Sequence, residues 1–295
     1  MKKQHLSMIF VNVMWGLSVV ASKHAMNSGF TPLVLALVRY VIASACLVPA
    51  LLKSEKRMSL NKRDMLPMAL SGFVGITVYY FFEYHGINRT SAVDASLILA
   101  AIPILTMLAE SVLFHTRMRL MQTVGSLVSL GGVALILVGS AQEQASLTGN
   151  LLILGAAAVW VAYIFLSRRL REDYSSLAMN TWQALAALLT LIPLALTETC
   201  NIAAIPWDGW AAAAVLAVIC SALCYYLYGN ALSAMSPLAS AIYINLIPLT
   251  TIIAGVMFLN ESITWINAVG GLLIVVSIAM VNIAEARREQ GANRG

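Results

Sequence analysis

The sequence predicts an all-α polytopic membrane protein of ten transmembrane helices, built from two inverted five-helix repeats. Three observations predict it: an apolar composition, a one-sided distribution of basic residues and an internal repeat. Of the 295 residues, 60% are hydrophobic and only 11% are charged, which is more apolar surface than a water-soluble domain can bury. The apolar runs do not alternate as the strands of a membrane β-barrel would, so we expect helices.

Ten apolar runs are long enough to cross a bilayer, which takes about 20 helical residues. The connections between the runs are short and leave no room for a water-soluble domain. The expected spans are 6–26, 32–52, 65–87, 92–114, 120–140, 149–170, 176–197, 209–233, 238–259 and 264–284.

Basic residues gather on one side of these spans. All but three of the 18 Lys and Arg residues lie at the termini or in the connections after spans two, four and six; the exceptions are Lys23, Arg39 and Arg89. Basic connections stay in the cytoplasm. We therefore predict a multi-pass protein of the plasma (bacterial inner) membrane with both termini cytoplasmic. The net charge of +5 reports topology, and no nucleic-acid partner is expected.

The second half of the chain repeats the first without a gap at a shift of 145 residues. Trp15 corresponds to Trp160, and Pro103 to Pro248. Each copy holds five spans, and because five is odd the copies must cross the membrane in opposite senses. The predicted division is a first repeat at 1–143, a second at 144–284 and a polar, disordered tail at 285–295.

Inverted repeats are typical of secondary transporters, which bind substrate near the membrane midplane where the repeats meet. Pro103 and Pro248 each remove a backbone hydrogen bond, so they are the predicted weak points of spans four and nine. The glycine-containing faces of spans five and ten, such as Gly125 and Gly270, suit packing between protomers or within one chain equally.

Polar and aromatic side chains interrupt the apolar faces of the other spans. They predict a cavity for an amphipathic or aromatic small molecule rather than a bare inorganic ion. Aromatic residues also form belts at membrane interfaces, so part of these rings would be anchors. The candidate substrate-binding residues are Trp15, Tyr79, Glu83, Ser96, Trp160, Tyr163, Tyr225 and Asn245.

Ionisable side chains inside a span are costly and usually functional. Arg39 is either an anion-binding or gating residue, the partner of an interior carboxylate, or a side chain that reaches the outer interface. Glu83 is the candidate for proton coupling, with His85 and Glu110 as alternatives. Glu110 could instead reach the cytoplasmic interface.

Catalytic signatures are missing from the sequence. The four histidines are dispersed, and neither a HExxH, a GxSxG nor a Walker motif is present. The four cysteines show no disulfide or metal-ligand spacing. We therefore expect no enzyme, no cofactor and no metal, and keep an intramembrane enzyme only as an alternative.

Several motifs together resemble the EamA repeat of the drug/metabolite transporter superfamily. They are Trp15-Gly16 with Lys23, Arg39-Tyr40, the two Ile-Pro pairs of spans four and nine, and Asn260-Glu261. The first copy departs from the pattern at His115-Thr116, where an acidic residue would be expected. The resemblance implies a ten-helix inner-membrane carrier that exports amino acids, metabolites or drugs. It also implies a cavity lined mainly by spans one, three, four, six, eight and nine.

The sequence therefore predicts a secondary active transporter that works by alternating access on a small-molecule substrate within the lipid bilayer. Amino acids, aromatic ones among them, related metabolites and drugs are the expected cargo. Export coupled to protons and an uncoupled channel or facilitator are the two options for its energetics.

Overall fold

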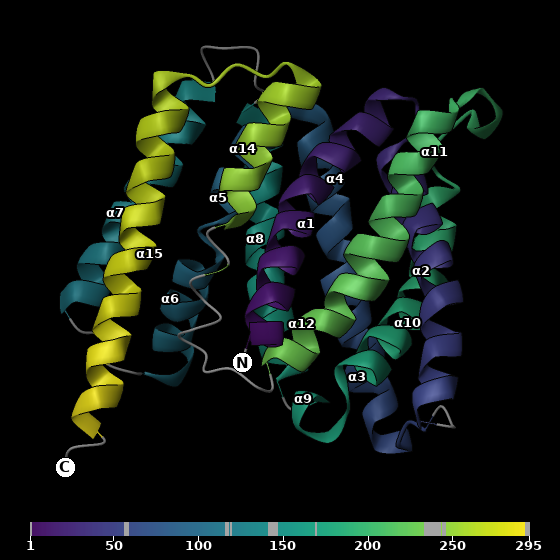
Figure 1. The fold of residues 1–295 in the computed structure, drawn as a ribbon, viewed down its shortest axis with the longest axis horizontal. Helices are drawn as coiled ribbons and strands as arrows, with labels where there is room; N and C mark the ends of the chain where they lie inside the picture. Colours follow the sequence, from purple (N-terminus) through teal and green to yellow (C-terminus); the bar gives the residue numbers. More distant parts are fainter. Residues whose placement is uncertain are drawn as a thin grey trace.

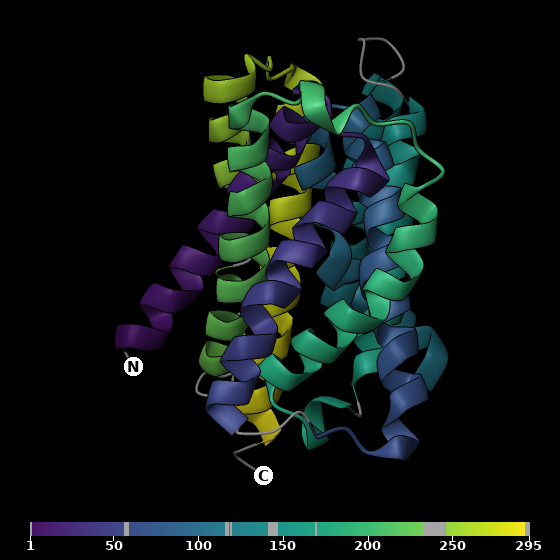
Figure 2. The same ribbon diagram turned by 90° about the vertical axis from the view of Figure 1, so that its right-hand side faces the viewer.

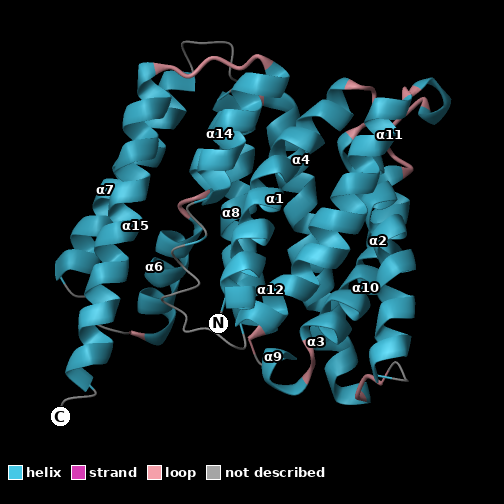
Figure 3. Cartoon of the chain, viewed as in Figure 1, coloured by secondary structure: helices cyan, strands magenta, loops and turns pink. Residues whose placement is uncertain are grey.

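The computed structural model describes residues 2–55, 59–115, 118, 120–140, 147–168, 170–232, 243 and 246–292. These residues are helical almost throughout, and no strand occurs among them (Figure 3). They form one bundle in which the first and the last helix have their free ends at the same end (Figures 1 and 2). We call this end the terminal side and the opposite end the far side.

Eight helical stretches of the described chain are long and apolar enough to cross a membrane. They are Lys3–Asn27, Pro32–Glu55, Lys62–Arg89, Ala92–Phe114, Leu120–Gly139, Leu147–Ser167, Ser176–Ala195 and Trp207–Tyr228. Two shorter apolar helices, Leu246–Leu259 and Trp265–Val281, lie where spans nine and ten are expected. The chain is therefore a multi-pass membrane protein.

Several spans are composed of more than one helix. Span three contains η1 (Lys62–Asp64), α3 (Met65–Gly72), the π-helix η2 (Phe73–Val78) and α4 (Tyr79–Arg89), and span eight contains α11 (Trp207–Ala214), the π-helix η4 (Val215–Leu223) and α12 (Cys224–Leu232). The other elements are α1 (Lys2–Asn27), α2 (Pro32–Glu55), α5 (Ala92–Leu99), α6 (Ile102–Phe114), α7 (Leu120–Ser140), α8 (Leu147–Ser167), α9 (Leu170–Asp173), α10 (Ser176–Ala195), η3 (Ile202–Ala204), α14 (Leu246–Leu259) and α15 (Trp265–Ala292).

Span four is divided beside its proline. α5 ends at Leu99 and α6 begins at Ile102, so that Pro103 lies in the first turn of the second helix. Proline has no N–H to donate to the carbonyl of Leu99 four residues earlier, and its ring clashes with that turn. Pro248 lies at the start of α14, but residues 244 and 245 just before that helix fall outside the described chain.

The C-terminal tail differs from the expectation. α15 continues to Ala292, so most of the segment from residue 285, which we expected to be disordered, is helical. The segment reads Glu-Ala-Arg-Arg-Glu-Gln, and all four of these residue types have high helix propensity. Their propensity extends the helix beyond its apolar part.

Two local features recur at the repeat distance. The π-helical residues 73–78 correspond, at a shift of 145, to residues 218–223 within η4. His115 after α6 and Asn260 after α14 also correspond, and both have the left-handed backbone value φ = 53°. Repeated sequence thus gives repeated irregularities as well as repeated helices.

α7 and α15 lie side by side and run in opposite directions (Figure 1). Their backbones approach closely at small residues, as is common between membrane helices. A Cβ atom on Gly132 would lie 2.7 Å from the carbonyl oxygen of Gly270, and one on Gly125 would lie 3.2 Å from that of Ser277. The glycine-containing faces therefore pack against each other within one chain.

We predict that Gly132→Ala lowers the melting temperature of the detergent-purified protein by several degrees, because the new methyl group meets backbone rather than a movable side chain. Gly131→Ala is the matched control, since nothing lies within 4 Å of a Cβ at that position. The control should be neutral or slightly stabilising, because alanine favours a helix by about 1 kcal/mol over glycine. Equal effects of the two substitutions would contradict the packing described.

Candidate functional site

Aromatic rings from five helices meet in the interior of the bundle. Neighbouring ring centroids lie 4.9–5.4 Å apart, with the planes tilted or T-shaped, as the electrostatics of aromatic rings favour. The aromatic cluster contains Trp15 of α1, Tyr40 of α2, Tyr79, Tyr80 and Tyr84 of α4, Trp160 and Tyr163 of α8, and Tyr225 and Tyr228 of α12.

The two π-helices shape the edge of this cluster. Gly75 of η2 faces the ring of Tyr163 so closely that a Cβ atom would overlap it. In η4, the Ser221 hydroxyl donates to the carbonyl of Leu216 at 3.0 Å, five residues earlier. The carbonyl of Cys220 accepts a bond from the indole N–H of Trp15 at 3.2 Å. The π-turns thus give a ring room to pack and offer backbone acceptors to another helix.

Arg39 lies inside this cluster with only 3% of its surface exposed. Its Nε donates to Ser221 Oγ at 2.7 Å, and Nη1 donates to the Tyr84 hydroxyl at 2.7 Å. The guanidinium carbon lies 4.8 Å from the centre of the Tyr80 ring, a cation–π distance. Among the described residues, no carboxylate lies within ion-pair distance of Arg39, so hydroxyl groups and an aromatic face solvate its charge.

Glu83 is the acidic residue of the cluster. Its side chain is buried, and Oε1 accepts a hydrogen bond from the Tyr79 hydroxyl at 3.0 Å, one helical turn away. Glu83 precedes Tyr84, the hydroxyl partner of Arg39. Among the described residues, the aromatic cluster therefore contains one acidic and one basic side chain, each bonded to a tyrosine of α4.

A cavity of about 20 Å³ opens among these rings, which is enough for one water molecule. No acidic or basic side chain is among the described residues that line it. Four rings form most of its wall, and the amide and hydroxyl groups of three side chains provide the polar part. The lining residues are Tyr40, Leu47, Gly75, Ile76, Trp160, Tyr163, Asn180, Gln183, Ser221 and Tyr225.

Gln183 fixes the position of one ring of this wall. Its Oε1 accepts from the Tyr163 hydroxyl at 3.1 Å, and its Nε2 donates to Ser71 Oγ at 2.9 Å. A Cβ on Gly72 would lie 2.6 Å from the Gln183 carbonyl oxygen, so α3 and α10 are in backbone contact here. The Gln183 amide is thus held from both sides.

A second cavity, of about 240 Å³, lies between α6 and α8 near the terminal side. It is lined by Thr106, Glu110, Ile164, Phe165 and Arg168. Glu110 Oε1 and Arg168 Nη1 are 3.9 Å apart, and their side chains are 49% and 66% exposed. An exposed pair at this distance contributes little stability. The pair of Glu110 and Arg168 therefore holds α6 and α8 together only weakly on this side of the molecule.

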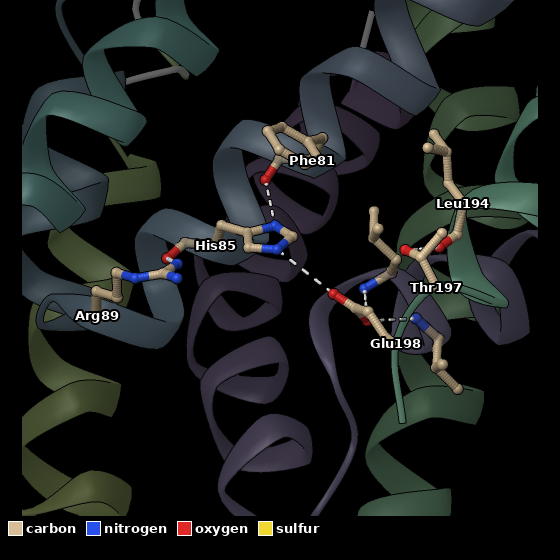
Figure 4. A network of polar contacts seen from close by, with 8 residues as sticks. Phe81, His85, Arg89, Leu194, Thr197 and Glu198 are labelled. Atoms are coloured by element: carbon tan, nitrogen blue, oxygen red, sulfur yellow. Dashed lines mark hydrogen bonds and ion pairs between the residues drawn. The ribbon is translucent and has the colours of Figure 1, made fainter. Parts of the chain in front are cut away.

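On the far side, Glu198 joins the two halves of the chain (Figure 4). Its Oε2 accepts from the backbone N–H groups of Leu33 at 2.8 Å and Val34 at 3.4 Å, in the first turn of α2. Its Oε1 lies 3.4 Å from Nε2 of His85, whose Nδ1 lies 2.8 Å from the carbonyl oxygen of Phe81. A carboxylate at a helix N-terminus satisfies free N–H groups and is favoured by the helix dipole.

Glu261 makes the same kind of contact elsewhere on the far side. Its two carboxylate oxygens accept from the N–H groups of Ala92 at 2.7 Å and Val93 at 3.0 Å, in the first turn of α5. A Cβ on Gly255 would lie 3.2 Å from Glu261 Oε2, so the missing side chain gives the carboxylate room. Both carboxylates follow helices of the second half and bind helix N-termini of the first half.

Further polar contacts surround the Glu261 contact. Lys23 donates to the carbonyl oxygens of Ile87 at 2.6 Å and Thr90 at 2.7 Å, at the end of α4. The Asp94 carboxylate accepts from the amides of Asn150, at 3.1 Å, and Asn267. The far side is thus held together by several charge-assisted hydrogen bonds, most of them partly buried.

The profile of the EamA-like transporter family matches the chain twice, at residues 2–138 and 147–283. The chain belongs to this family. The two matches to the EamA profile are displaced by 145 residues, the shift of the internal repeat. EamA proteins are transporters, so the protein is a transporter rather than an enzyme, and it acts on a small-molecule substrate.

Several relatives match this EamA protein over nearly their whole length. A probable terminal-alkyne amino-acid exporter of Streptantibioticus cattleyicolor is 26% identical, with 98% of this chain and 95% of the relative covered. A transporter of Archaeoglobus fulgidus is 24% identical over 98% and 99% of the two chains. A WAT1-related protein of Arabidopsis thaliana is 26% identical over 95% and 82%. One crystal structure, 21% identical, matches 95% of this chain and 98% of its own with a TM-score of 0.65, which shows a shared fold.

The structure brings most of the candidate residues of the EamA chain together. Six of the eight candidate substrate-binding residues, together with Arg39, lie in or beside the aromatic cluster; these six are Trp15, Tyr79, Glu83, Trp160, Tyr163 and Tyr225. The interpretation in which Arg39 reaches the outer interface does not fit its burial, whereas a role as the partner of an interior carboxylate, without a direct ion pair among the described residues, stays a prediction. The gating or anion-binding interpretation stays a prediction.

Three other candidates lie elsewhere. Ser96 is buried in α5 and bonds the carbonyl of Val93, and no described contact links it to the aromatic cluster. His85 lies on the far side next to Glu198. Glu110 lines the second cavity beside Arg168. Asn245 falls outside the described residues.

The sequence analysis missed three residues that the EamA structure singles out. Asn180 lines the central cavity, and the sequence analysis did not assign it a role although it lies three residues before Gln183 in the same span. Glu198 and Glu261 were unassigned because the helix ends that they bind are 165 and 169 residues away in the chain. The acidic residue of Asn260-Glu261 was visible as a motif, but its partner was not.

We predict that Arg39→Lys lowers the melting temperature of this EamA protein by about 5 °C or more, since losing one charged hydrogen bond costs about 1.5–3 kcal/mol. A lysine ammonium cannot bond Ser221 and Tyr84 with the fixed geometry of a guanidinium while covering the Tyr80 ring. Arg89→Lys, at an exposed position, is the control and should change the temperature little. An unchanged melting temperature of Arg39→Lys would show that the hydrogen bonds of the guanidinium group are not needed for the stability of the bundle.

Proposed function

We propose that the protein is a secondary active transporter of the inner membrane that exports amino acids, aromatic ones among them, or related metabolites by alternating access. The observation that carries this proposal is the central cavity, walled by four aromatic rings inside the bundle of a transporter-family protein. A small apolar cavity with a few placed polar groups suits a ring-bearing small molecule. The likeness to a probable amino-acid exporter supports the cargo class.

We infer that the bundle has ten spans arranged as two inverted repeats, at 1–143 and 144–284. Two family matches, paired π-helices and paired left-handed residues support the duplication. Inversion is supported by the connections: α6 ends and α7 begins on the terminal side, whereas α14 ends and α15 begins on the far side (Figure 1). The charge pattern of the sequence supports a cytoplasmic terminal side.

In this proposal the far side is the closed side of the transport cycle. Glu198 and Glu261 bind helix N-termini across the two halves, and a hydrogen bond to a charged group is worth about 1.5–3 kcal/mol. Opening this side must break or exchange these contacts. On the terminal side, the described contact between α6 and α8 is an exposed pair beside the larger cavity. The arrangement therefore corresponds to a state that is closed outwards.

We predict that Glu261→Gln accelerates hydrogen–deuterium exchange at the start of α5. Glutamine offers one acceptor oxygen where the carboxylate uses two, and it lacks the charge that the helix dipole favours. The readout is exchange of the peptide that contains Ala92 and Val93, measured by mass spectrometry of the protein in lipid nanodiscs.

Asp208→Asn is the matched control for this experiment. Asp208 lies in α11 and pairs with His24, also between the two halves, but both side chains are more than 40% exposed. The control should leave α5 exchange unchanged. If the exchange rate in Glu261→Gln equals that of the wild type, the Glu261 carboxylate does not hold the start of α5, and the far-side contacts play no part in the proposed mechanism.

Proton coupling is assigned to Glu83, with His85 and Glu110 as the alternatives. Glu83 is the only acidic side chain that the structure describes in contact with the aromatic cluster. His85 is bonded into the far-side contact of Glu198, and Glu110 is half-exposed on the terminal side. Glu83 is bonded to Tyr79, whose ring packs against the cavity-lining Trp160, so it is the carboxylate that a bound substrate would affect.

We predict that Glu83→Gln abolishes the dependence of transport on a pH gradient while exchange transport persists, because the amide cannot carry the proton. The measurement is flux of radiolabelled L-tyrosine and L-phenylalanine into proteoliposomes, with and without a pH gradient. Glu110→Gln serves as control and should keep the gradient dependence. Gradient-driven flux in Glu83→Gln would assign coupling elsewhere, and gradient-independent flux in the wild type would indicate a facilitator. No flux of either amino acid would count against the proposed cargo.

A further inference from the structure

Of the three non-aromatic polar side chains that line the central cavity, only that of Asn180 has no bonded partner among the described residues. No hydrogen bond or ion pair to its side chain occurs among the described residues, although it lines the cavity. Gln183 is held between Tyr163 and Ser71. Ser221 accepts from Arg39 and donates to Leu216. The Asn180 amide therefore keeps both its donors and its acceptor for an occupant of the cavity.

Ser44 adds a second unused polar group near the same place. It lies on α2 between Tyr40 and Leu47, at the helical spacing that puts all three on one face, and both neighbours line the cavity. Its hydroxyl is buried and has no partner among the described residues. Buried polar groups almost always have a partner. Ser44 does not itself line the water-sized cavity, so its hydroxyl and the Asn180 amide are two polar groups on packed helices that a ligand in a wider cavity would satisfy.

The lining of the cavity restricts the chemistry of that ligand. None of the described lining residues is acidic or basic, and the charges of Arg39 and Glu83 are already bonded to tyrosines. A charged group placed there would lose its hydration without meeting a counter-charge in the lining itself, at a high cost. A neutral donor or acceptor attached to a ring fits both the walls and the free amide.

A ring needs more room than the water-sized cavity offers. The lining includes Gly75 and Ile76 of η2 and Ser221 of η4, so both π-helices border the space. π-turns are rare in proteins and are frequently found at functional sites. Substrate entry would therefore widen the cavity at these segments.

We propose that Asn180 is a specificity-determining residue, whose amide hydrogen-bonds a neutral hydroxyl or N–H group on the aromatic ring of the substrate. This inference rests on the proposed function, since it names the part of an aromatic cargo that the central cavity recognises. A site built to bond a hydroxyl group discriminates against the analogue that lacks it, because its own polar group is then left unpaired.

The test compares L-tyrosine with L-phenylalanine, which differ only in the ring hydroxyl. Dissociation constants are measured by radioligand binding to the purified wild type, Asn180→Leu and Asn180→Ser. We expect the wild type to prefer tyrosine, and Asn180→Leu to lower that preference about tenfold through its effect on tyrosine alone. Asn180→Ser keeps a hydroxyl group and should retain part of the preference.

Thr181→Val is the matched control. Thr181 is buried on the same helix, and among the described residues its hydroxyl donates only to the backbone carbonyl of Leu177, one turn earlier in that helix. This substitution should leave the preference unchanged. If Asn180→Leu does not fold, the smaller change to serine decides the outcome. Equal weakening of both ligands, or an unchanged preference, would overturn the role of Asn180 and leave the proposed function intact. Failure of the wild type to bind either amino acid would overturn both.

Discussion

A guanidinium group inside a membrane span has to be solvated by the protein, and the central part of this bundle is arranged around that requirement. Arg39 bonds a serine of one π-helix and a tyrosine of α4, and lies over a second tyrosine. These partners come from spans three and eight, so one side chain of span two fixes three helices relative to one another. Because its partners are neutral, the charge can still respond to an anion or to a change at Glu83.

The π-helices explain how such an interior can be built from membrane helices. A regular helix bonds all of its carbonyl groups internally, and a span in lipid has no water to replace those bonds. In η4 the Cys220 carbonyl accepts from Trp15, and in η2 Gly75 accommodates the ring of Tyr163. The irregular turns lie where other helices cover them. Both repeats carry such a turn at equivalent positions, so each half contributes an adaptable segment to the same cavity.

Much of this architecture is contained in the sequence. Composition and apolar run length locate the helices, and the constant 145-residue shift gives the duplication, because both depend on local pattern. The rings of Trp15, Tyr79 and Trp160 could be named in advance, since aromatic residues on interior faces cluster.

What the sequence leaves open depends on helix rotation and on distant partners. Ser96 was expected at the site on the same kind of helical spacing, but it is buried in α5 and its hydroxyl bonds the carbonyl of Val93. The contacts of Glu198 and Glu261 join residues more than 160 positions apart, and no single-sequence pattern reports them. The helical C-terminal segment shows that propensity can extend a helix past the end of its apolar stretch.

The close pair of α7 and α15 has a consequence for how the protein moves. Neither helix contributes a described residue to either cavity, while their backbones meet at Gly132 and Gly270 with no room for a side chain. If one half of the chain moves against the other, α7 and α15 must keep their relative position along the helix axes, because a shift of one residue would bring a side chain into contact with the backbone of the facing helix. In the proposed alternating-access cycle, α7 and α15 therefore stay fixed relative to each other, and the movement takes place in the other helices of the bundle.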